Sequence, residues 1–367
     1  MTPTVAAVSE LPKTMKAVRC YGPRDYRLEE VPVPQPGPGE VLVRVLACGV
    51  CASDGKCHQG AALYWGDEHR PQYVQPPVTA GHEFIGQVVA LGEGAGEKHG
   101  LSIGDMAIAE QVLPCWNCRF CKSGKYWVCQ ANHVFGFRTV AQGGMAEYML
   151  YPAGAIVHKV PSDMPIHRAA LIEPLSCSIH AVQRGGIELG DVVVIAGAGT
   201  LGLGMIGAAR LKNPGLLVAM DVVDSRLEIA RQLGADLTIN PAREDPIQRI
   251  RDLTDGYGCD VFIEATGNPQ AVVTGLHMVR RLGTFVEFSV MAGETTVDWT
   301  IIGDGKELDV RGAHLGPYCY PLAIQYIHKG LINVDPIVTD QMPLDRFEEA
   351  FEKVHSARDS IKVLLVP

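Results

Sequence analysis

The sequence lacks an excess of positive charge, and this excludes several classes of function. Its 367 residues include 32 Lys and Arg against 41 Asp and Glu, which gives a formal net charge of −9. Nucleic acids and anionic membranes bind to basic surfaces. We therefore expect neither nucleic acid nor membrane as the main partner.

Long apolar runs are missing too. The longest apolar stretch, VVVIAGAGTLGLGMIGAA, is interrupted by glycines and is too short to span a bilayer comfortably. The first twenty residues show no basic segment followed by an apolar core, which a secretory signal requires. We expect a cytoplasmic protein, whose eleven cysteines would then be thiols or metal ligands rather than disulfides.

Glycine and proline, by contrast, are abundant, with 40 and 24 residues, and favour many tight turns. A chain of this length is expected to form about two domains. Residues 15–160 carry β-branched runs separated by turn clusters and read as β-rich. From about residue 165, strand-like and helix-like segments alternate, which predicts an α/β domain with a parallel, doubly wound sheet. The last fifty residues predict two helices and a final strand.

A glycine-rich loop follows the first strand of this alternating region. Gly197, Gly199 and Gly202 have the G-x-G-x-x-G spacing that brings a dinucleotide pyrophosphate to a helix N-terminus. Asp221 follows nineteen residues later, at the end of the next predicted strand, where a carboxylate can accept both ribose hydroxyls. It would repel a 2′-phosphate, so NAD is expected rather than NADP. The alternative for the three glycines is a plain glycine-rich turn without a ligand, and the alternative for Asp221 is a solvated acid at a strand end.

Four cysteines lie within fifteen residues in a C-x₂-C-x₂-C-x₇-C pattern: Cys115, Cys118, Cys121 and Cys129. Four thiolates can close a tetrahedral zinc site with no open position, which is typical of structural zinc. An iron–sulfur cluster is the alternative. A zinc ribbon that binds nucleic acid is a further one, supported by Arg119, Lys122 and Lys125 and opposed by the acidic chain.

A second set of possible metal ligands combines Cys51 with His82 and Glu83, which follow one another in the sequence. Cysteine, histidine and carboxylate form a mixed zinc ligand set, and three protein ligands leave one position for a substrate. The alternative is a small buried cysteine and a core histidine.

At this point the sequence resembles the zinc-dependent medium-chain alcohol dehydrogenases. GVCASD, GHEFIGQVV, IGDMAIAE, the four cysteines, GAGTLG and EATG occur in that family's order, and the resemblance runs from Met15 to Pro367. The motifs IEPLSCSIHA and GPYCYP are most similar to the polyol branch, the sorbitol- and erythritol/threitol-type dehydrogenases.

The resemblance implies roles for individual residues. The catalytic zinc ligands would be drawn from Cys51, His82, Glu83 and Glu173. Ethanol-type relatives carry a cysteine at the position of Glu173, and whether Glu173 or Glu83 is the closer ligand stays open. Pro174, Cys177 and His180 would be ordinary helix and core residues, and for Glu173 a favourable place at a helix N-terminus is the alternative.

Proton transfer is expected to begin at Ser53, which would take the proton of the substrate alcohol. Asp54 would orient the zinc-bound histidine. Many relatives end the relay at a histidine where this chain has Lys56, so Lys56, His58 or water could complete it. The segment between Asp54 and His82 is also longer than usual. Four of its residues either line the substrate pocket or pack a surface loop: Tyr64, Trp65, His69 and Arg70.

The resemblance also assigns the cofactor site. Lys362 would contact the pyrophosphate, with an exposed strand-end lysine as the alternative. The full set of expected cofactor residues is Gly197, Gly199, Thr200, Leu201, Gly202, Asp221, Arg226, Thr266 and Lys362.

The implied architecture is a GroES-like β-rich catalytic domain and a Rossmann cofactor domain. The first would comprise residues 1–172 and 313–367, with a structural zinc lobe at 110–130, and the second residues 173–312. The implied activity is reversible, NAD-linked oxidation of a secondary hydroxyl of a polyol to a ketose. Alternatives are a threonine 3-dehydrogenase, a simple secondary-alcohol dehydrogenase or a zinc-independent reductase. A homo-oligomer is expected, a tetramer rather than a dimer.

Overall fold

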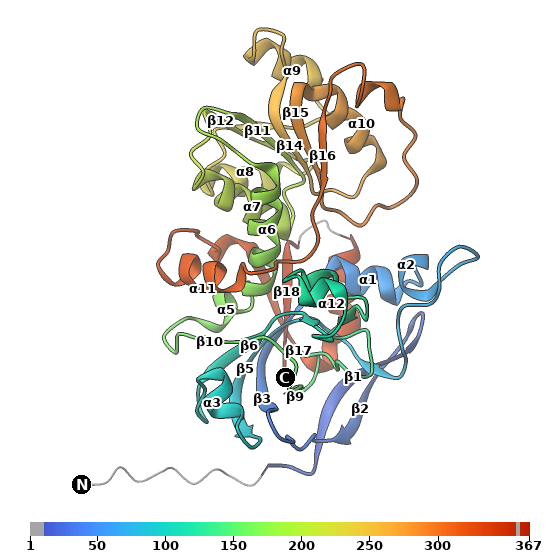
Figure 1. The fold of residues 1–367 in the computed structure, drawn as a ribbon, viewed down its shortest axis with the longest axis vertical. Coiled ribbons are helices and arrows are strands. Elements are labelled where there is room, and N and C mark those ends of the chain that lie inside the picture. The colour runs from blue at the N-terminus through green and yellow to red at the C-terminus, as the bar shows by residue number, and fades with distance from the viewer. Residues whose placement is uncertain (1–10, 357–359) are drawn as a thin grey trace. The chain divides into compact units, whose positions relative to one another are not determined.

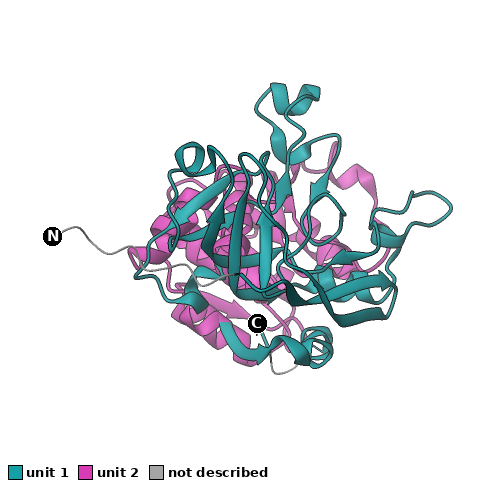
Figure 2. Ribbon diagram, turned by 90° about the horizontal axis from the view of Figure 1, so that it is seen from below, with its two compact units in different colours: residues 1–171, 338–367 teal, residues 172–337 magenta. Residues whose placement is uncertain are grey.

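The chain forms two compact units in the computed structural model, which describes residues 11–356 and 360–367 (Figure 1). Residues 1–171 and 338–367 belong to the first unit and residues 172–337 to the second, and Figure 2 colours them separately. Residues 1–10 lie outside the described residues. They are the first half of the twenty residues in which the sequence shows no secretory signal.

The first unit is built mainly from strands. Its larger sheet has the order β10-β6-β5-β3-β18-β17, with β9 paired to β3, and its smaller sheet has the order β2-β1-β4. Buried valines of the central strand β3 alternate along the core, as its β-branched sequence predicts. The strands are β1 (Thr14–Gly22), β2 (Asp25–Pro32), β3 (Val41–Val50), β4 (Val78–Thr79), β5 (Glu83–Leu91), β6 (Met106–Ala109), β7 (Val112–Leu113), β8 (His133–Val134), β9 (Tyr148–Tyr151), β10 (Val157–Val160), β17 (Val338–Pro343) and β18 (Lys362–Val366).

Helices of the first unit are short apart from the last. They are α1 (Ala52–His58), α2 (Ala62–Trp65), α3 (Ala95–His99), α4 (Arg119–Lys122), α5 (Ile166–Ala169) and α12 (Phe347–Ser356), with 3₁₀ turns η1 (Tyr126–Val128) and η4 (Leu344–Arg346).

The second unit contains one six-stranded parallel sheet in the order β13-β12-β11-β14-β15-β16. The strand order reverses between β11 and β14, which confirms the doubly wound fold expected from the alternating sequence. The strands are β11 (Val192–Ala196), β12 (Leu216–Met220), β13 (Leu237–Ile239), β14 (Cys259–Glu264), β15 (Val279–Glu287) and β16 (Asp309–Gly312). The helices are α6 (Ile172–Gly185), α7 (Thr200–Arg210), α8 (Asp224–Gln232), α9 (Pro246–Leu253), α10 (Pro269–Met278) and α11 (Tyr320–His328), with 3₁₀ turns η2 (Trp299–Ile301) and η3 (Asp335–Ile337).

The second boundary between the units differs from the expected one. The architecture implied by the resemblance assigned residues 313–337 to the β-rich domain, whereas the structure groups them with the parallel sheet. The reason is α11, which packs against α6 with Tyr320, Ala323 and Ile327 buried. An amphipathic pattern shows that a helix buries one face but not which domain receives it.

Among the residues that the structure describes, none of the helices has the length and apolar character needed to cross a bilayer.

Candidate metal centres and cofactor site

The four-cysteine segment forms a small lobe between β7 and β8, which pair antiparallel. All four Sγ atoms lie within 4.8 Å of one another. Backbone amides donate to three of the sulfurs: Gln130 N and Cys121 N each lie 3.5 Å from Cys118 Sγ, Cys118 N lies 3.3 Å from Cys115 Sγ, and Cys115 N lies 3.3 Å from Cys129 Sγ. These amide hydrogen bonds stabilise negative sulfur.

The pKa values of the lobe differ between its cysteines: burial raises the pKa of Cys121 to about 12, whereas backbone hydrogen bonds lower that of Cys118. The amides of Gln130 and Cys121 lower the pKa of Cys118 to about 6. Since the thiolate is the form that binds metal, a cysteine already ionised near neutral pH suits a zinc ligand. The four cysteines fit a closed tetrahedral site of the kind that has a structural role.

The second donor set lies where α1 and β5 begin. Cys51 is the N-cap of α1, and His82 directly precedes β5. A sulfur from Cys51, a ring nitrogen of His82 and a carboxylate oxygen of Glu83 all lie within 4.8 Å of one another. Gly81 makes the turn that presents His82, with a φ of 93° and no room for a side chain, because a Cβ would lie 2.6 Å from Cys48 Sγ. The sequence motifs thus bring three of the expected ligands together.

Asp54 connects the two halves of this set. Its Oδ2 accepts a hydrogen bond from Cys51 N at 2.9 Å, and its Oδ1 lies 3.3 Å from His82 Nδ1. Burial by itself lowers the pKa of His82, but the charges of Asp54 and Cys51 outweigh it and raise that pKa well above its usual value. The local field is therefore strongly negative, which favours a bound cation, and Asp54 is placed to fix the orientation of the ring.

Glu83 has a partner that the sequence did not indicate. Lys362 Nζ donates to Glu83 Oε2 and, at 3.1 Å, to Val50 O. Lys362 is only 2% exposed, so the alternative of an exposed strand-end lysine is wrong. It sits deep in the first unit beside a candidate ligand, and its contact with a pyrophosphate stays a prediction.

Space for the Glu83 side chain comes from a glycine on the neighbouring strand. Gly49 of β3 is the register partner of Glu83, and a Cβ at Gly49 would lie 2.2 Å from Glu83 Oε2. Sequence reasoning missed both Gly49 and the role of Lys362. The available signal was a glycine inside a strand, which often marks a close approach by another group.

Ser53 lies beside His82, with Ser53 Oγ 3.4 Å from His82 Nε2. His58 faces elsewhere: its ring packs edge-on against Tyr26 and Phe351, with centroids 5.1 and 5.3 Å away. His58 lies five residues after Ser53 on the same helix, so the two side chains point in directions that differ by roughly 140°. Lys56, three residues from Ser53, lies nearer the same face of α1, where it is half-buried and has interaction partners of its own.

The long segment between Asp54 and His82 divides into an inner and an outer part. Tyr64 is 6% exposed and stacks on Phe137 at 5.3 Å, whereas Trp65 donates from Nε1 to Cys57 O at 2.7 Å. His69 and Arg70, in contrast, are exposed on a turn and pair with acidic neighbours. Tyr64 and Trp65 therefore pack against the core of the first unit, and His69 and Arg70 lie on a surface loop, whereas a role of any of them in lining the substrate pocket stays a prediction.

The glycine loop of the second unit has the geometry that its spacing predicts. Gly197 has a φ of 98°, and a Cβ at Gly202 would lie 1.7 Å from Gly197 O. Gly199 is the N-cap of α7, and a Cβ there would meet no atom of the protein within 4 Å. The first and third glycines are thus required by the fold. Thr200, Leu201 and Gly202 form the first turn of α7, and the N-terminus of a helix is a position that suits an anionic group.

Asp221 follows β12 and lies against this loop. Its Oδ2 accepts from Ala198 N at 2.7 Å and its Oδ1 from Val223 N at 2.8 Å. Arg226 lies in the first turn of α8, directly after. Thr266 follows β14, where its amide donates to Glu264 Oε1 at 2.7 Å. All of these positions lie at the carboxyl ends of parallel strands, the edge at which such sheets bind ligands.

Glu173 belongs to the second unit, in the first turn of α6. It is 4% exposed, and Cys177 Sγ lies 3.4 Å from its Oε1 as a donor. Pro174 lies in the same first turn, and Cys177 and His180 are buried in the helix, as expected for core residues. Burial lowers the pKa of His180 to about 4, so this histidine is neutral at physiological pH.

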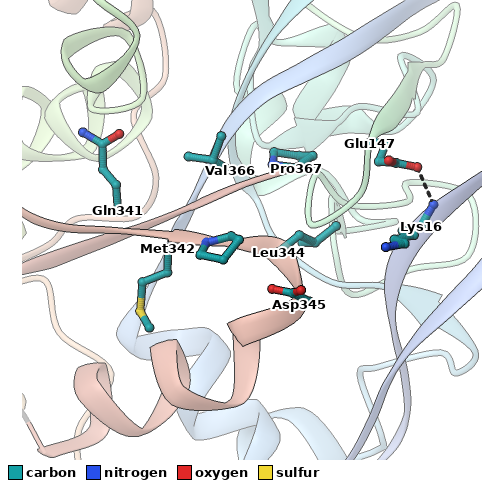
Figure 3. Close-up of a pocket in the computed structure, with 9 residues that line it drawn as sticks. Lys16, Glu147, Gln341, Met342, Leu344, Asp345, Val366 and Pro367 are labelled. Carbon is teal, nitrogen blue, oxygen red and sulfur yellow. Dashed lines mark hydrogen bonds between the residues drawn. The ribbon is translucent and has the colours of Figure 1, made fainter.

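One surface pocket of the first unit carries no such chemistry. Its walls come from β17, β18, the start of β1 and the strand β9 region, and Lys16 N donates to Glu147 Oε2 at 2.7 Å inside it (Figure 3). The lining residues are Lys16, Glu147, Gln341, Met342, Pro343, Leu344, Asp345, Val366 and Pro367. They include neither cysteine nor histidine, and none of the expected site residues.

Comparison with known proteins finds a matching protein family for each unit. Residues 37–162 match the model of the alcohol dehydrogenase GroES-like domain, and residues 200–329 match that of the zinc-binding dehydrogenases. The chain is 52% identical to an erythritol/L-threitol dehydrogenase of Mycolicibacterium smegmatis, over 98% of this chain and 99% of that one.

More distant similarities point the same way. An L-threonine 3-dehydrogenase of Pyrococcus horikoshii is 36% identical, over 96% of this chain and 97% of its own. A zinc-binding dehydrogenase from Sinorhizobium meliloti, solved with NADP bound, is similar in structure with a TM-score of 0.86 at 28% identity. That similarity covers 97% of this chain and 100% of the other.

Proposed function

This chain belongs to the zinc-dependent medium-chain alcohol dehydrogenases, and from that membership we propose that it oxidises a secondary hydroxyl of a short polyol, a tetritol of the erythritol or L-threitol type, to a ketose. The observation that carries this proposal is the 52% identity to an erythritol/L-threitol dehydrogenase along almost the whole chain. The donor set of Cys51, His82 and Glu83 supports it, because dehydrogenation of an alcohol at a metal needs such a site.

Cys51 and His82 are the proposed holders of the catalytic zinc, and the four-cysteine lobe of the structural one. When bound, catalytic zinc supplies a Lewis acid that lowers the pKa of an alcohol hydroxyl. Asp54 fixes the His82 ring, and Ser53 is the proposed acceptor of the substrate proton, within 3.4 Å of His82 Nε2. From the resemblance to the polyol branch alone, Glu173 is the proposed remaining ligand, with Glu83 held nearby by Lys362.

NAD is the proposed hydride acceptor. Gly197, Gly199 and Gly202 would admit its pyrophosphate to the N-terminus of α7, and Asp221 would bind the adenine ribose. The carboxylate of Asp221 favours NAD over NADP, although the solved relative from Sinorhizobium meliloti holds NADP.

The oligomeric state and location are also proposals. The edge strand β16 has hydrogen-bonding groups directed away from its sheet and could pair with a second copy, which supports a homo-oligomer, and the resemblance to the polyol branch favours a tetramer. No disulfide joins any of the eleven cysteines, all of which lie in the described part of the chain, and this agrees with the reducing, cytoplasmic location expected from the sequence.

A substrate panel tests the proposal against its main alternative. The second candidate, threonine oxidation, is favoured by the similarity to the Pyrococcus enzyme. We expect kcat/KM for erythritol or L-threitol with NAD to exceed that for butan-2-ol by at least about tenfold, because a site that hydrogen-bonds substrate hydroxyls discriminates against analogues that lack them. It should also exceed kcat/KM for L-threonine and for sorbitol. A higher kcat/KM for L-threonine than for the tetritols would overturn the proposed substrate. A preference for NADP over NAD would overturn the proposed cofactor.

A further inference from the structure

The turn that presents His82 is enclosed by a distant segment of the first unit. Residues 135–145, which we call the clamp segment, follow the four-cysteine lobe in the sequence. Three of its backbone amides donate to the chain just before His82. These bonds run from Gly143 N to Thr79 O at 2.8 Å, from Met145 N to Ala80 O at 2.9 Å and from Gly144 N to Gly81 O at 2.9 Å. They fix the backbone from which the His82 side chain projects.

Glycines allow the clamp segment to approach this turn closely. A Cβ at Gly143 would lie 2.2 Å from Ala80 O, and a Cβ at Gly136 would lie 2.8 Å from Gly81 N. Gly136 also has a φ of 83°, in the left-handed region that favours glycine. The clamp segment therefore rests directly on the backbone of the turn, and the residue after Gly136 is carried to the side of His82.

That residue is Phe137, whose ring contacts the His82 ring. The two ring centroids lie 5.5 Å apart with an interplanar angle of 35°, within the range of favourable ring contacts. Phe137 is 5% exposed, and its own ring is held by Tyr64, stacked at 5.3 Å, and by Tyr73 at 6.0 Å. Its backbone is held as well, because Phe137 O accepts from Gln75 N at 2.9 Å. Phe137 is thus a rigid neighbour of His82.

Polar contacts hold the His82 ring at its two nitrogens. Asp54 Oδ1 lies 3.3 Å from Nδ1, and Ser53 Oγ lies 3.4 Å from Nε2. Contacts at two points on the edge of a ring leave its tilt open, and the χ2 torsion of histidine has only broad minima. A rigid ring packed beside the imidazole restricts that tilt.

We propose that Phe137 is a positioning residue for His82, which fixes the tilt of the imidazole so that it can hold zinc together with Cys51. The inference rests on the proposed catalytic zinc and not on the identity of the substrate. Phe137 acts through His82 and supplies no ligand atom. Loss of a group that orients a metal ligand typically costs about 10–100-fold in metal affinity or activity.

The test compares Phe137→Leu with a matched control, Phe135→Leu. Leucine keeps an apolar side chain but loses the flat ring. Phe135 lies in the same clamp segment and is fully buried, but its ring packs on Phe84 at 5.3 Å. Both variants lose an aromatic side chain from the same core, so both should melt at similarly lowered temperatures. Only Phe137→Leu should release the catalytic zinc more easily.

The measurement is the chelator concentration that removes the first zinc ion from the zinc-loaded enzyme, followed by metal analysis. We expect this concentration to fall at least about tenfold in Phe137→Leu and to change by less than about twofold in Phe135→Leu. A Cys51→Ser background should retain only the zinc of the four-cysteine lobe. Adding Phe137→Leu to that background should leave the release of the lobe zinc unchanged.

Cobalt gives a second measurement, which loss of stability alone would not change. Cobalt exchanged into the more readily released site has d–d absorption bands that respond to the directions of its ligands. We expect these bands to shift in Phe137→Leu and to stay in place in Phe135→Leu.

Three results would overturn the inference. Unchanged zinc release and cobalt bands in Phe137→Leu would mean that Phe137 does not position His82. Equal effects of the two leucine variants would mean that packing of the clamp segment alone is responsible, and earlier release of the lobe zinc would place the effect at the other site. If Phe137→Leu does not fold, Phe137→Met, which also lacks the ring, takes its place under the same criteria.

Failure of the proposed function is distinguishable from failure of the inference. A wild type that binds only the lobe zinc would overturn the proposed catalytic zinc together with the inference. A wild type that binds both ions, with wild-type zinc release in Phe137→Leu, would overturn the inference alone.

Discussion

At the scale of single residues, the charge balance around the candidate catalytic set depends on Lys362. Its ammonium is buried with the carboxylate of Glu83, and both side chains are at most 3% exposed. Buried charges are tolerated only when they are paired and hydrogen bonded. Glu83 therefore has a cationic partner that belongs to the protein, which distinguishes it from a carboxylate that depends on metal alone.

Replacing Lys362 by Met should destabilise the first unit strongly. Removal of one partner of a buried pair leaves an uncompensated charge and costs about 3–5 kcal/mol, which corresponds to a fall in Tm of roughly 6 °C or more. The double variant Lys362→Met, Glu83→Gln should melt above the single one, because it leaves no charge behind. Calorimetric scans of the zinc-loaded enzyme would measure both.

The control for this experiment is Lys353→Met in the same unit. Lys353 pairs with Asp340 at 2.6 Å, but its side chain is 38% exposed, so its loss should cost less than about 1 kcal/mol. Equal Tm values for the Lys362 and Lys353 variants would contradict a special role for the buried pair.

At the scale of elements, the sequence predicted those sites whose residues lie within one turn or one strand–loop–helix unit. The glycine loop and the four cysteines are of this kind, because short spacing brings their atoms together whatever the rest of the chain does. Tyr64 and Lys362 are different: they reach Phe137 and Glu83 across 73 and 279 residues, and no local pattern encodes such contacts. The position of α11 was mispredicted for the same reason, since its partner α6 lies far away in the sequence.

The loop after β12 gives a prediction at this scale. Replacing Asp221 by Asn removes the negative charge that would oppose a 2′-phosphate, so the ratio of kcat/KM with NADP to that with NAD should rise at least about tenfold. Asp221 also accepts from Ala198 N and Val223 N, so the amide substitution should cost some thermal stability as well.

A matched variant separates the two effects. Asp236 accepts a backbone amide in the same way, from Leu217 N at 2.8 Å, but it precedes β13 and therefore lies at the opposite edge of the sheet. Asp236→Asn should lower stability without changing the cofactor ratio. If Asp221→Asn leaves that ratio unchanged, the carboxylate does not select the cofactor.

At the scale of the whole molecule, residues 11–356 and 360–367 carry two donor sets of different character. The four-cysteine set leaves no position for a substrate, whereas Cys51, His82 and Glu83 leave one. The first is therefore expected to support folding and the second chemistry. The four cysteines, Cys51, His82 and Glu83 belong to the β-rich unit, whereas the proposed ligand Glu173 and the glycine loop belong to the other unit.

Paired cysteine variants test this division of roles. We expect Cys51→Ser to reduce the zinc content from about two ions per chain to about one, to lower kcat/KM at least about 10³-fold, and to leave Tm nearly unchanged. Cys115→Ser should also lose about one zinc ion, but its main effect should be a lower Tm, because binding at a structural site contributes directly to folding free energy. Metal analysis, steady-state kinetics and melting curves of the two variants together decide the matter. Equal Tm losses would show that the sets are not functionally distinct, and a fully active wild type with fewer than two zinc ions would favour a zinc-independent reductase of the same fold.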